Sequence, residues 1–276
     1  MIKHPDLAKL KEGDLFWISV EKLHPTQFCV GIVSAECKRL AIEEHAAKGE
    51  LQQFLCKEGS LVPVVIGPPG KTLYLTDHHH LCAALWRAEL PKGEAKKVAA
   101  NVLHDWSDLD SQAFWDRMYE HHLAWLYDQN GTGPLNPSFL PRYIGDVLND
   151  PYRTLSRWIR DAGCYVKDEL KDKDRSMCDE DTFVPSAKNA AFFIEFRWAN
   201  FFRQNIVLDE KPQIFHLTCA LMPRHPDNGF VKEVITLRRA LTEVIRLIGC
   251  NQLRTVTYDG KGCLQSAKPI RRKKAG

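Results

Sequence analysis

The segment 62–89 constrains the fold more than any other part of this sequence. Residues 62–66 are apolar and mostly β-branched, which predicts a strand, and residues 72–75 predict a second one. The Gly-Pro-Pro-Gly sequence between them is typical of a tight turn, because Pro fixes φ and Gly supplies positive φ. Leucine and alanine then recur at helical spacing up to about residue 89, so this hairpin is expected to lead directly into a helix.

The motif Asp-His-His-His at residues 77–80 stands at the expected start of that helix, with Asp77 as its N-cap. The first turn of a helix has unpaired N–H groups and the positive end of the helix dipole, so phosphate or carboxylate can bind there. Consecutive residues point about 100° apart, so we expect two of the histidines to face a ligand. The alternatives are a simple N-cap beside half-buried histidines, and a zinc site with His104 and Asp105, although no spacing matches a standard zinc motif.

The rest of the first hundred residues continues the mixture of strands and helices. A loop is expected at 23–27, because Pro25 removes a backbone donor. Ser34 is the expected N-cap of a helix that runs to residue 48. Further expected elements are a strand at 15–20, one or two helical turns at 51–57 and a strand at 97–103.

The sequence changes character at residue 108, where aromatic and apolar residues begin to recur at helical spacing. The expected class is therefore α+β, with an α/β domain at 14–107, a helical domain at 108–205 that packs on the cleft, and a C-terminal extension at 206–276. Expected helices in the later part lie at 138–148, 151–162, 185–204 and 229–248, before a basic tail at 268–276.

Composition sets limits on partners and location. The net charge of +3 over 276 residues permits a nucleic-acid partner but does not favour one. The N-terminus lacks the apolar core of a signal peptide, and no apolar run is long enough to span a membrane. Nine cysteines without a Cys-x-x-Cys pair are expected to be reduced thiols in a cytoplasmic protein with no membrane partner.

Residues 76–84 resemble the helix-start motif of the ParB/sulfiredoxin superfamily. On that register His78 takes the place of the ParB glutamate and the sulfiredoxin cysteine, and His79 matches a histidine shared with sulfiredoxins. His80 stands where those relatives have arginine. The resemblance implies a ParB/sulfiredoxin-like small mixed sheet with helices. Because a histidine replaces the nucleophilic thiolate, sulfiredoxin activity is expected to be absent.

A closer resemblance is to the family described as putative ParB-like nuclease, and it runs from about Val20 to Arg203. It rests on several short motifs, which in chain order are Leu23-x-Pro25-Thr26-Gln27, Pro63-Val64-Val65-Ile66-Gly67-Pro68, Asp77-His78-His79-His80-Leu81, Phe114-Trp115-x-x-Met118, Asp150-Pro151-Tyr152-Arg153 and Glu195-Phe196-x-Trp198-Ala199. This resemblance places an active or ligand site at the Asp-His-His-His motif.

Five other residues are candidates for the same site. Glu21 follows the first strand and is a candidate general base, by resemblance to the free-serine kinases of the superfamily. Thr26 and Gln27 are loop donors suited to a ligand, Lys38 lies on the next helix, and Arg153 is an anion-binding residue type. For each of these residues an ordinary surface, capping or ion-pairing role is the alternative.

Three functions remain open at this point. The first is a small-molecule enzyme that binds ATP or ADP with Mg²⁺ at residues 77–80, as a free amino-acid kinase-like phosphotransferase does, since phosphoryl transfer depends mainly on positioning and electrostatics. The second is a DNA-binding protein or nuclease of ParB type, which would need a basic surface. The third is a ligand sensor without catalysis. No metal-ligand set is predicted from the sequence itself.

Overall fold

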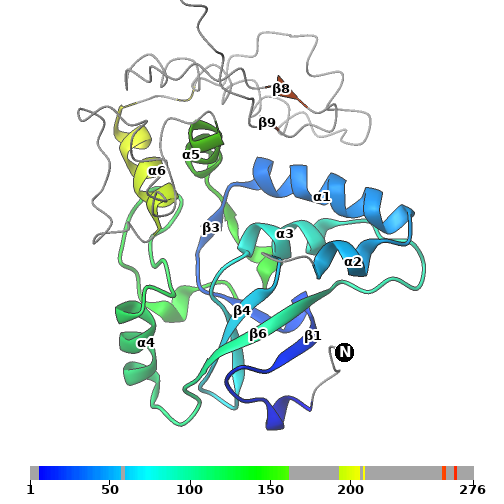
Figure 1. Cartoon of the computed structure of the whole chain (residues 1–276). Helices are drawn as coiled ribbons and strands as arrows, with labels where there is room; N and C mark the ends of the chain where they lie inside the picture. Colours follow the sequence, from blue (N-terminus) through cyan, green and yellow to red (C-terminus); the bar gives the residue numbers. More distant parts are fainter. Residues whose placement is uncertain are drawn as a thin grey trace, which may run out of the picture. The chain divides into compact units, whose positions relative to one another are not determined.

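The computed structural model in Figure 1 describes residues 6–56, 60–161, 193–205 and 208, together with two short strands near the C-terminus. The chain divides into two compact units, Met1–Asp150 and Pro151–Gly276. This division lies after Asp150, whereas the sequence analysis placed a boundary at residue 107. The difference arises because helix α4 (Ser111–Glu120) packs through Phe114 and Met118 in a core of the first unit.

A five-stranded mixed sheet forms the centre of the first unit, with the strand order β1-β6-β4-β5-β2. Strands β4 and β5 form the expected antiparallel hairpin, β4 runs parallel to β6, β2 runs parallel to β5, and β1 is antiparallel to β6. The C-terminal ends of strands β1, β2 and β5 therefore lie at one end of the sheet, and the C-terminal ends of β4 and β6 lie at the opposite end. The bounds are Leu15–Ser19 for β1, Leu23–Pro25 for β2, Val62–Gly67 for β4, Thr72–Leu75 for β5 and Lys97–Asp105 for β6.

Alternate residues of a strand point to opposite faces of the sheet. The apolar residues on a face are buried where helices pack over it. Leu73 and Leu75 of β5 belong to the larger core, whereas Tyr74 packs in a smaller cluster with Phe114. Figure 1 shows the helices α1, α2 and α3 gathered beside one another along the sheet. Their bounds are Ile32–Ala47 for α1, Leu51–Leu55 for α2 and His79–Arg87 for α3, and their buried apolar residues, from Ala35 to Leu85, complete the larger core.

Two elements differ from the expectations. The expected loop at 23–27 begins with strand β2, which tolerates Pro25 because β2 lies at the edge of the sheet, where a missing N–H leaves no gap in a ladder. The expected helix at 138–148 is wrong, since Pro141 cannot continue a helix and Gly145 packs against Trp86. Its place is taken by the short helices η3 (Pro137–Phe139) and η4 (Ile144–Asp146) and by strand β7 (Leu148–Asn149), which pairs in parallel with β3 (Cys29–Val30).

The second unit contains helices α5 (Pro151–Asp161) and α6 (Ile194–Asn205) and the strand pair β8 (Thr257–Tyr258) and β9 (Leu264–Gln265). Helix α5 confirms the expected helix at 151–162, and α6 confirms the C-terminal half of the one expected at 185–204. The helix expected at 229–248 and the basic tail at 268–276 lie outside the described residues. No helix in the described ranges is long and apolar enough to cross a membrane.

Candidate functional site

The turn between β5 and α3 carries the Asp-His-His-His motif. His78, not Asp77, is the N-cap of α3, and it adopts a left-handed conformation with φ 63°. Asp77 instead accepts a 2.6 Å hydrogen bond from the backbone N–H of His78 through its Oδ1. A left-handed conformation is costly for a residue other than Gly or Asn and persists only where the surroundings enforce it. The expected N-cap is therefore shifted by one residue, which leaves Asp77 exposed in front of the helix.

His79 is buried, with 2% of its surface exposed, and its imidazole anchors a distant segment. The backbone N–H of Thr26 donates to His79 Nε2 at 3.1 Å. An imidazole nitrogen that accepts a hydrogen bond carries no proton, so in this geometry a neutral His79 carries its proton on Nδ1. His79 thus fixes the end of β2 to the first turn of α3.

Thr26 joins three segments at this point. Its hydroxyl lies 2.7 Å from the carbonyl oxygen of Leu75 and 2.9 Å from that of Leu123, and its single proton can be donated to either. Its own carbonyl oxygen accepts from the N–H of Trp125 at 2.9 Å. Thr26 was expected to be an exposed ligand donor, but it is fully buried and holds β2, β5 and the segment after α4 together.

His80, like His79, accepts a backbone N–H through Nε2, but from the start of helix α1. The N–H of Gly31, the N-cap residue of α1, donates to His80 Nε2 at 3.1 Å. The next N–H, of Ile32, donates to Asn149 Oδ1 at 3.0 Å. The expected N-cap Ser34 is instead the third residue of α1, because these two contacts begin the helix at Ile32. The N-termini of α1 and α3 therefore meet at the His80 imidazole.

The three histidines consequently have different roles. His79 and His80 both use Nε2 to accept backbone N–H groups, so neither of these atoms is available to a ligand. His78 is half-buried and Asp77 is exposed. The expectation that two histidines face a ligand stays a prediction, and the structure adds that His79 and His80 each use one ring nitrogen in a backbone contact.

The other sequence candidates lie in different places. Glu21 is exposed on the short helix η2 (Val20–Lys22) after β1. The short helix η2 packs against α3, yet among the described residues the Glu21 carboxylate makes no hydrogen bond or ion pair with residues 77–80. The role of Glu21 as a general base stays a prediction. Gln27 is buried beside Thr26 and forms a β-bridge with Trp125, whereas Lys38 is exposed on α1.

Arg153 lies in the second unit, where it forms a buried ion pair with Glu195. Arg160 pairs with the other carboxylate oxygen of Glu195, so this acid joins α5 to α6. Glu195 on α6 is a partner that sequence spacing does not reveal, because it depends on how α5 and α6 pack against each other. Arg153 thus has a structural contact that accounts for its burial.

The zinc alternative requires His104 and Asp105 to approach residues 77–80. Both residues lie at the C-terminal end of β6. Because β5 and β6 run in opposite directions, this is the end of the sheet opposite to the one where β5 leads into residues 77–80. His104 stacks on Trp106 with ring centroids 4.6 Å apart, and Asp105 accepts from Ser107 and Lys71. Within the described ranges no group of three or more His, Cys, Asp or Glu residues is arranged to hold a metal ion.

Cys82 lies on α3 with none of its surface exposed. Burial, and then the negative charge of Asp77, raise the pKa of its thiol well above the ordinary range. A thiol held in the protonated form is a poor nucleophile. Cys82 therefore packs in the core, which gives no support to sulfiredoxin chemistry.

A mixed sheet whose strand β5 turns directly into a helix through residues 77–80 defines an α+β domain of the ParB/sulfiredoxin type. The sequence model of the family described as "Putative ParB-like nuclease" matches residues 16–174, more than half of the chain, and the chain belongs to this family. The crystal structure of protein Atu1540 from Agrobacterium tumefaciens is similar, with a TM-score of 0.56, 27% sequence identity, and coverage of 84% of this chain and 90% of that chain. No curated protein matches.

Proposed function

We propose that this ParB-like domain protein binds the phosphate groups of a small nucleotide, ATP or ADP with Mg²⁺, at the Asp77–His78 turn, and that it acts as a phosphotransferase on a small molecule. The observation that carries the proposal is the meeting of two helix N-termini through the contact between Gly31 N–H and His80 Nε2. Each helix N-terminus is equivalent to about half a positive charge. The Gly31 and Ile32 N–H groups are already bonded to His80 and Asn149, so at the start of α1 it is this charge rather than these two donors that attracts an anion. Two such ends at one place favour an anion with more than one negative charge.

Asp77 and His78 are the residues that would act on such an anion. Asp77 offers an exposed carboxylate, and Mg²⁺ bound mainly through phosphates typically takes one or two protein carboxylates, so this donor fits the ion. When bound, Mg²⁺ would neutralise phosphate charge. His78 is half-buried beside Asp77, and imidazole exchanges protons near neutral pH, so we assign His78 the role of carrying a proton to or from a substrate.

Charge distribution favours a small anion over DNA at this site. Residues 1–150 carry 15 Lys and Arg against 20 Asp and Glu, a formal charge of −5. A polyanion such as duplex DNA binds through many phosphate contacts to basic side chains. A single nucleotide needs only the local positive end of the helices.

The second candidate is a nuclease, and two observations favour it. The family to which the chain belongs is described as putative ParB-like nuclease. Residues 151–276 carry 23 Lys and Arg against 15 Asp and Glu, a formal charge of +8, which could supply DNA affinity from the second unit. In that case the Asp77–His78 turn would act on a phosphodiester.

The full-length protein should gain thermal stability when ADP and Mg²⁺ are added. At a free ligand concentration of 100 times Kd the expected gain is about 2.7 kcal/mol, which a melting curve detects easily. His78→Asn retains a residue that tolerates the left-handed conformation and removes the imidazole, so it should lose most of the gain without unfolding. Asp77→Asn keeps an acceptor for the His78 N–H but removes the charge, so it should remove the additional effect of Mg²⁺.

The control is His121→Asn, since His121 is an exposed histidine of the same unit, and it should behave as the wild type. The nuclease becomes the better function if ADP gives no shift while DNA is cleaved in a reaction that needs His78. Nucleotide binding without any transfer or hydrolysis would instead indicate a sensor.

A further inference from the structure

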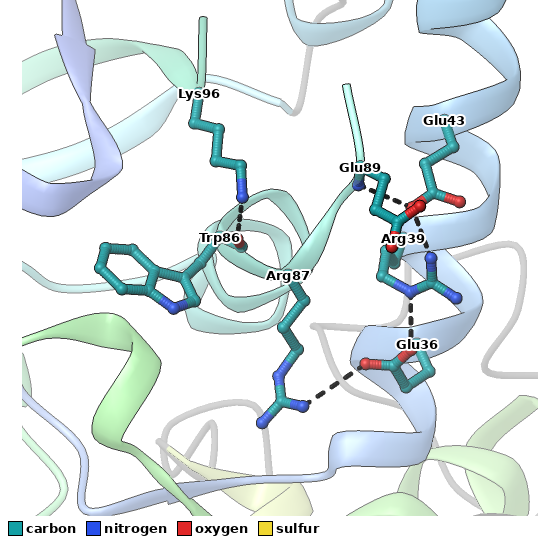
Figure 2. A network of polar contacts seen from close by, with 7 residues as sticks. All are labelled: Glu36, Arg39, Glu43, Trp86, Arg87, Glu89 and Lys96. Carbon is teal, nitrogen blue, oxygen red and sulfur yellow. Dashed lines mark hydrogen bonds and ion pairs between the residues drawn. The ribbon is translucent and has the colours of Figure 1, made fainter. Parts of the chain in front are cut away.

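A buried network of charged residues holds the other end of α3. Figure 2 shows Arg39 of α1 between two acids of the same helix: its Nε lies 2.7 Å from Glu36 Oε2, and its Nη1 bonds Glu43 Oε1. Glu36 reaches the last residue of α3, because Arg87 Nη1 lies 3.6 Å from Glu36 Oε1. Glu43 reaches the segment just beyond α3, because the N–H of Glu89 donates to Glu43 Oε1 at 2.8 Å. Arg39 thereby links the two acids of α1 that contact the C-terminal end of α3 and the segment after it.

These contacts and the His80 contact together set the direction of the helix pair. His80, near the start of α3, meets Gly31 at the start of α1, whereas Arg87 and the residue two places beyond α3 meet acids further along α1. The two helices therefore run in the same direction. Parallel helices place like ends of their dipoles together, which is unfavourable unless other contacts hold them.

The network is poorly explained by stability alone. The side chains of Arg39 and Glu36 are only 7% and 8% exposed, and burying charged groups often contributes no more than well-packed apolar residues would. Within the described residues, Arg39 Nη2 is also buried without a hydrogen-bond partner. Although burial opposes it, hydrogen bonds and charges from Glu36 and Glu43 raise the pKa of Arg39, so the guanidinium stays charged.

We propose that Arg39 is a positioning residue for the anion site: by joining Glu36 and Glu43 it fixes where α3 lies along α1, and thus how closely the two helix N-termini meet at His80. This inference rests on the proposed function for the ligand it serves. The geometric claim, that the contact between Gly31 and His80 depends on Arg39, stands separately.

The test compares three full-length variants for ADP–Mg²⁺ affinity and for melting temperature. Arg39→Lys keeps the charge but cannot bond both acids as the forked guanidinium does, and it should weaken ADP binding about 5- to 20-fold. The triple variant Glu36→Leu, Arg39→Met, Glu43→Leu replaces the network with apolar side chains, which should preserve the melting temperature yet weaken binding at least as much. Lys48→Met removes an exposed ion pair with Glu44 on the same helix and should leave both measurements unchanged.

A second readout separates this inference from the proposed function. Hydrogen exchange of the Gly31 amide reports the His80 contact without any ligand, and it should accelerate at least 10-fold in Arg39→Lys while the Val102 amide in β6 keeps its rate. If wild-type protein does not bind ADP, the proposed function fails, and Gly31 exchange still decides the positioning role. Unchanged Gly31 exchange in Arg39→Lys and in any triple variant that folds overturns the inference, whatever ADP does.

Discussion

His79 and His80 are neighbours in the sequence, yet each imidazole accepts a backbone N–H from a different segment. The Thr26 amide lies 53 residues from His79 and the Gly31 amide lies 49 residues from His80. Successive helix residues diverge by about 100°, which lets one helix turn hold the end of β2 and the start of α1 at once. The pair therefore fixes the turn between β5 and α3 to two other segments, and in the proposed function the chemistry is assigned to Asp77 and His78.

Replacing His79 with Phe should destabilise the protein by about 1–3 kcal/mol, because the ring volume is kept while the Thr26 N–H loses its acceptor in a buried place. Urea unfolding measures the loss. His121→Phe makes the same substitution at an exposed position and should change the free energy of unfolding by less than about 0.5 kcal/mol. Equal effects at the two positions would show that the His79 contact adds nothing.

His24 predicts a pH dependence of stability. Burial, and then the positive charge of Arg142, lower the pKa of His24 in the folded protein below its ordinary value of 6.5. The unfolded chain therefore binds a proton first as the pH falls through 6.5, and the folded state loses stability below that pH. Between pH 7 and pH 5, His24→Gln should lose less stability than the wild type, as measured by urea midpoints. Identical pH profiles would contradict the assignment.

Residue roles were harder to predict from the sequence than residue positions. The Asp-His-His-His motif was correctly expected at the start of α3, but the contacts that bury His79 come from segments that sequence spacing does not relate. Arg153 is similar, since its partner Glu195 is 42 residues away on another helix. A pattern read along the chain reports local geometry, whereas these pairings depend on how distant elements pack.

At the scale of elements, the contact between β4 and α4 depends on the absence of a side chain. A Cβ built on Gly67 would lie 2.3 Å from Phe114 Cε2, so the Phe114 ring occupies that space. Gly67→Ala should therefore destabilise the protein by about 1–3 kcal/mol through overpacking. Gly67→Ala combined with Phe114→Leu should recover part of that loss relative to the sum of the single changes, as a double-mutant cycle measures. Strict additivity would mean that the two residues do not compete for space.

Elements with local signals were predictable, and elements that depend on partners were not. The hairpin 62–75 and the helix after it follow from turn residues and periodicity, and the structure confirms them. Strand β2 has only three residues and forms because β5 lies beside it, so Pro25 misled the prediction. The expected helix at 138–148 is wrong for two reasons: Pro141 interrupts it, which the sequence does show, and Gly145 packs against Trp86, which the sequence does not show.

At the scale of the whole molecule, charge is distributed unevenly along the chain. The first unit carries −5 and the second +8, although the total of +3 conceals this difference. The total net charge was therefore a weak guide to binding partners, since the two units carry formal charges of opposite sign. Any affinity for nucleic acid is expected to depend on residues 151–276 and to fall steeply as salt rises.

The hydrogen bond from the Ile32 N–H to Asn149 has a consequence for synthesis of the protein. These residues are 117 positions apart, so at 5–20 residues per second a ribosome needs about 6–23 s to add the second after the first. Helix α1 must wait that long for one of its N-terminal partners, and β3 waits equally long for β7. The nascent chain thus spends many seconds with an incomplete site, which makes this interval the period in which binding by a chaperone would matter most.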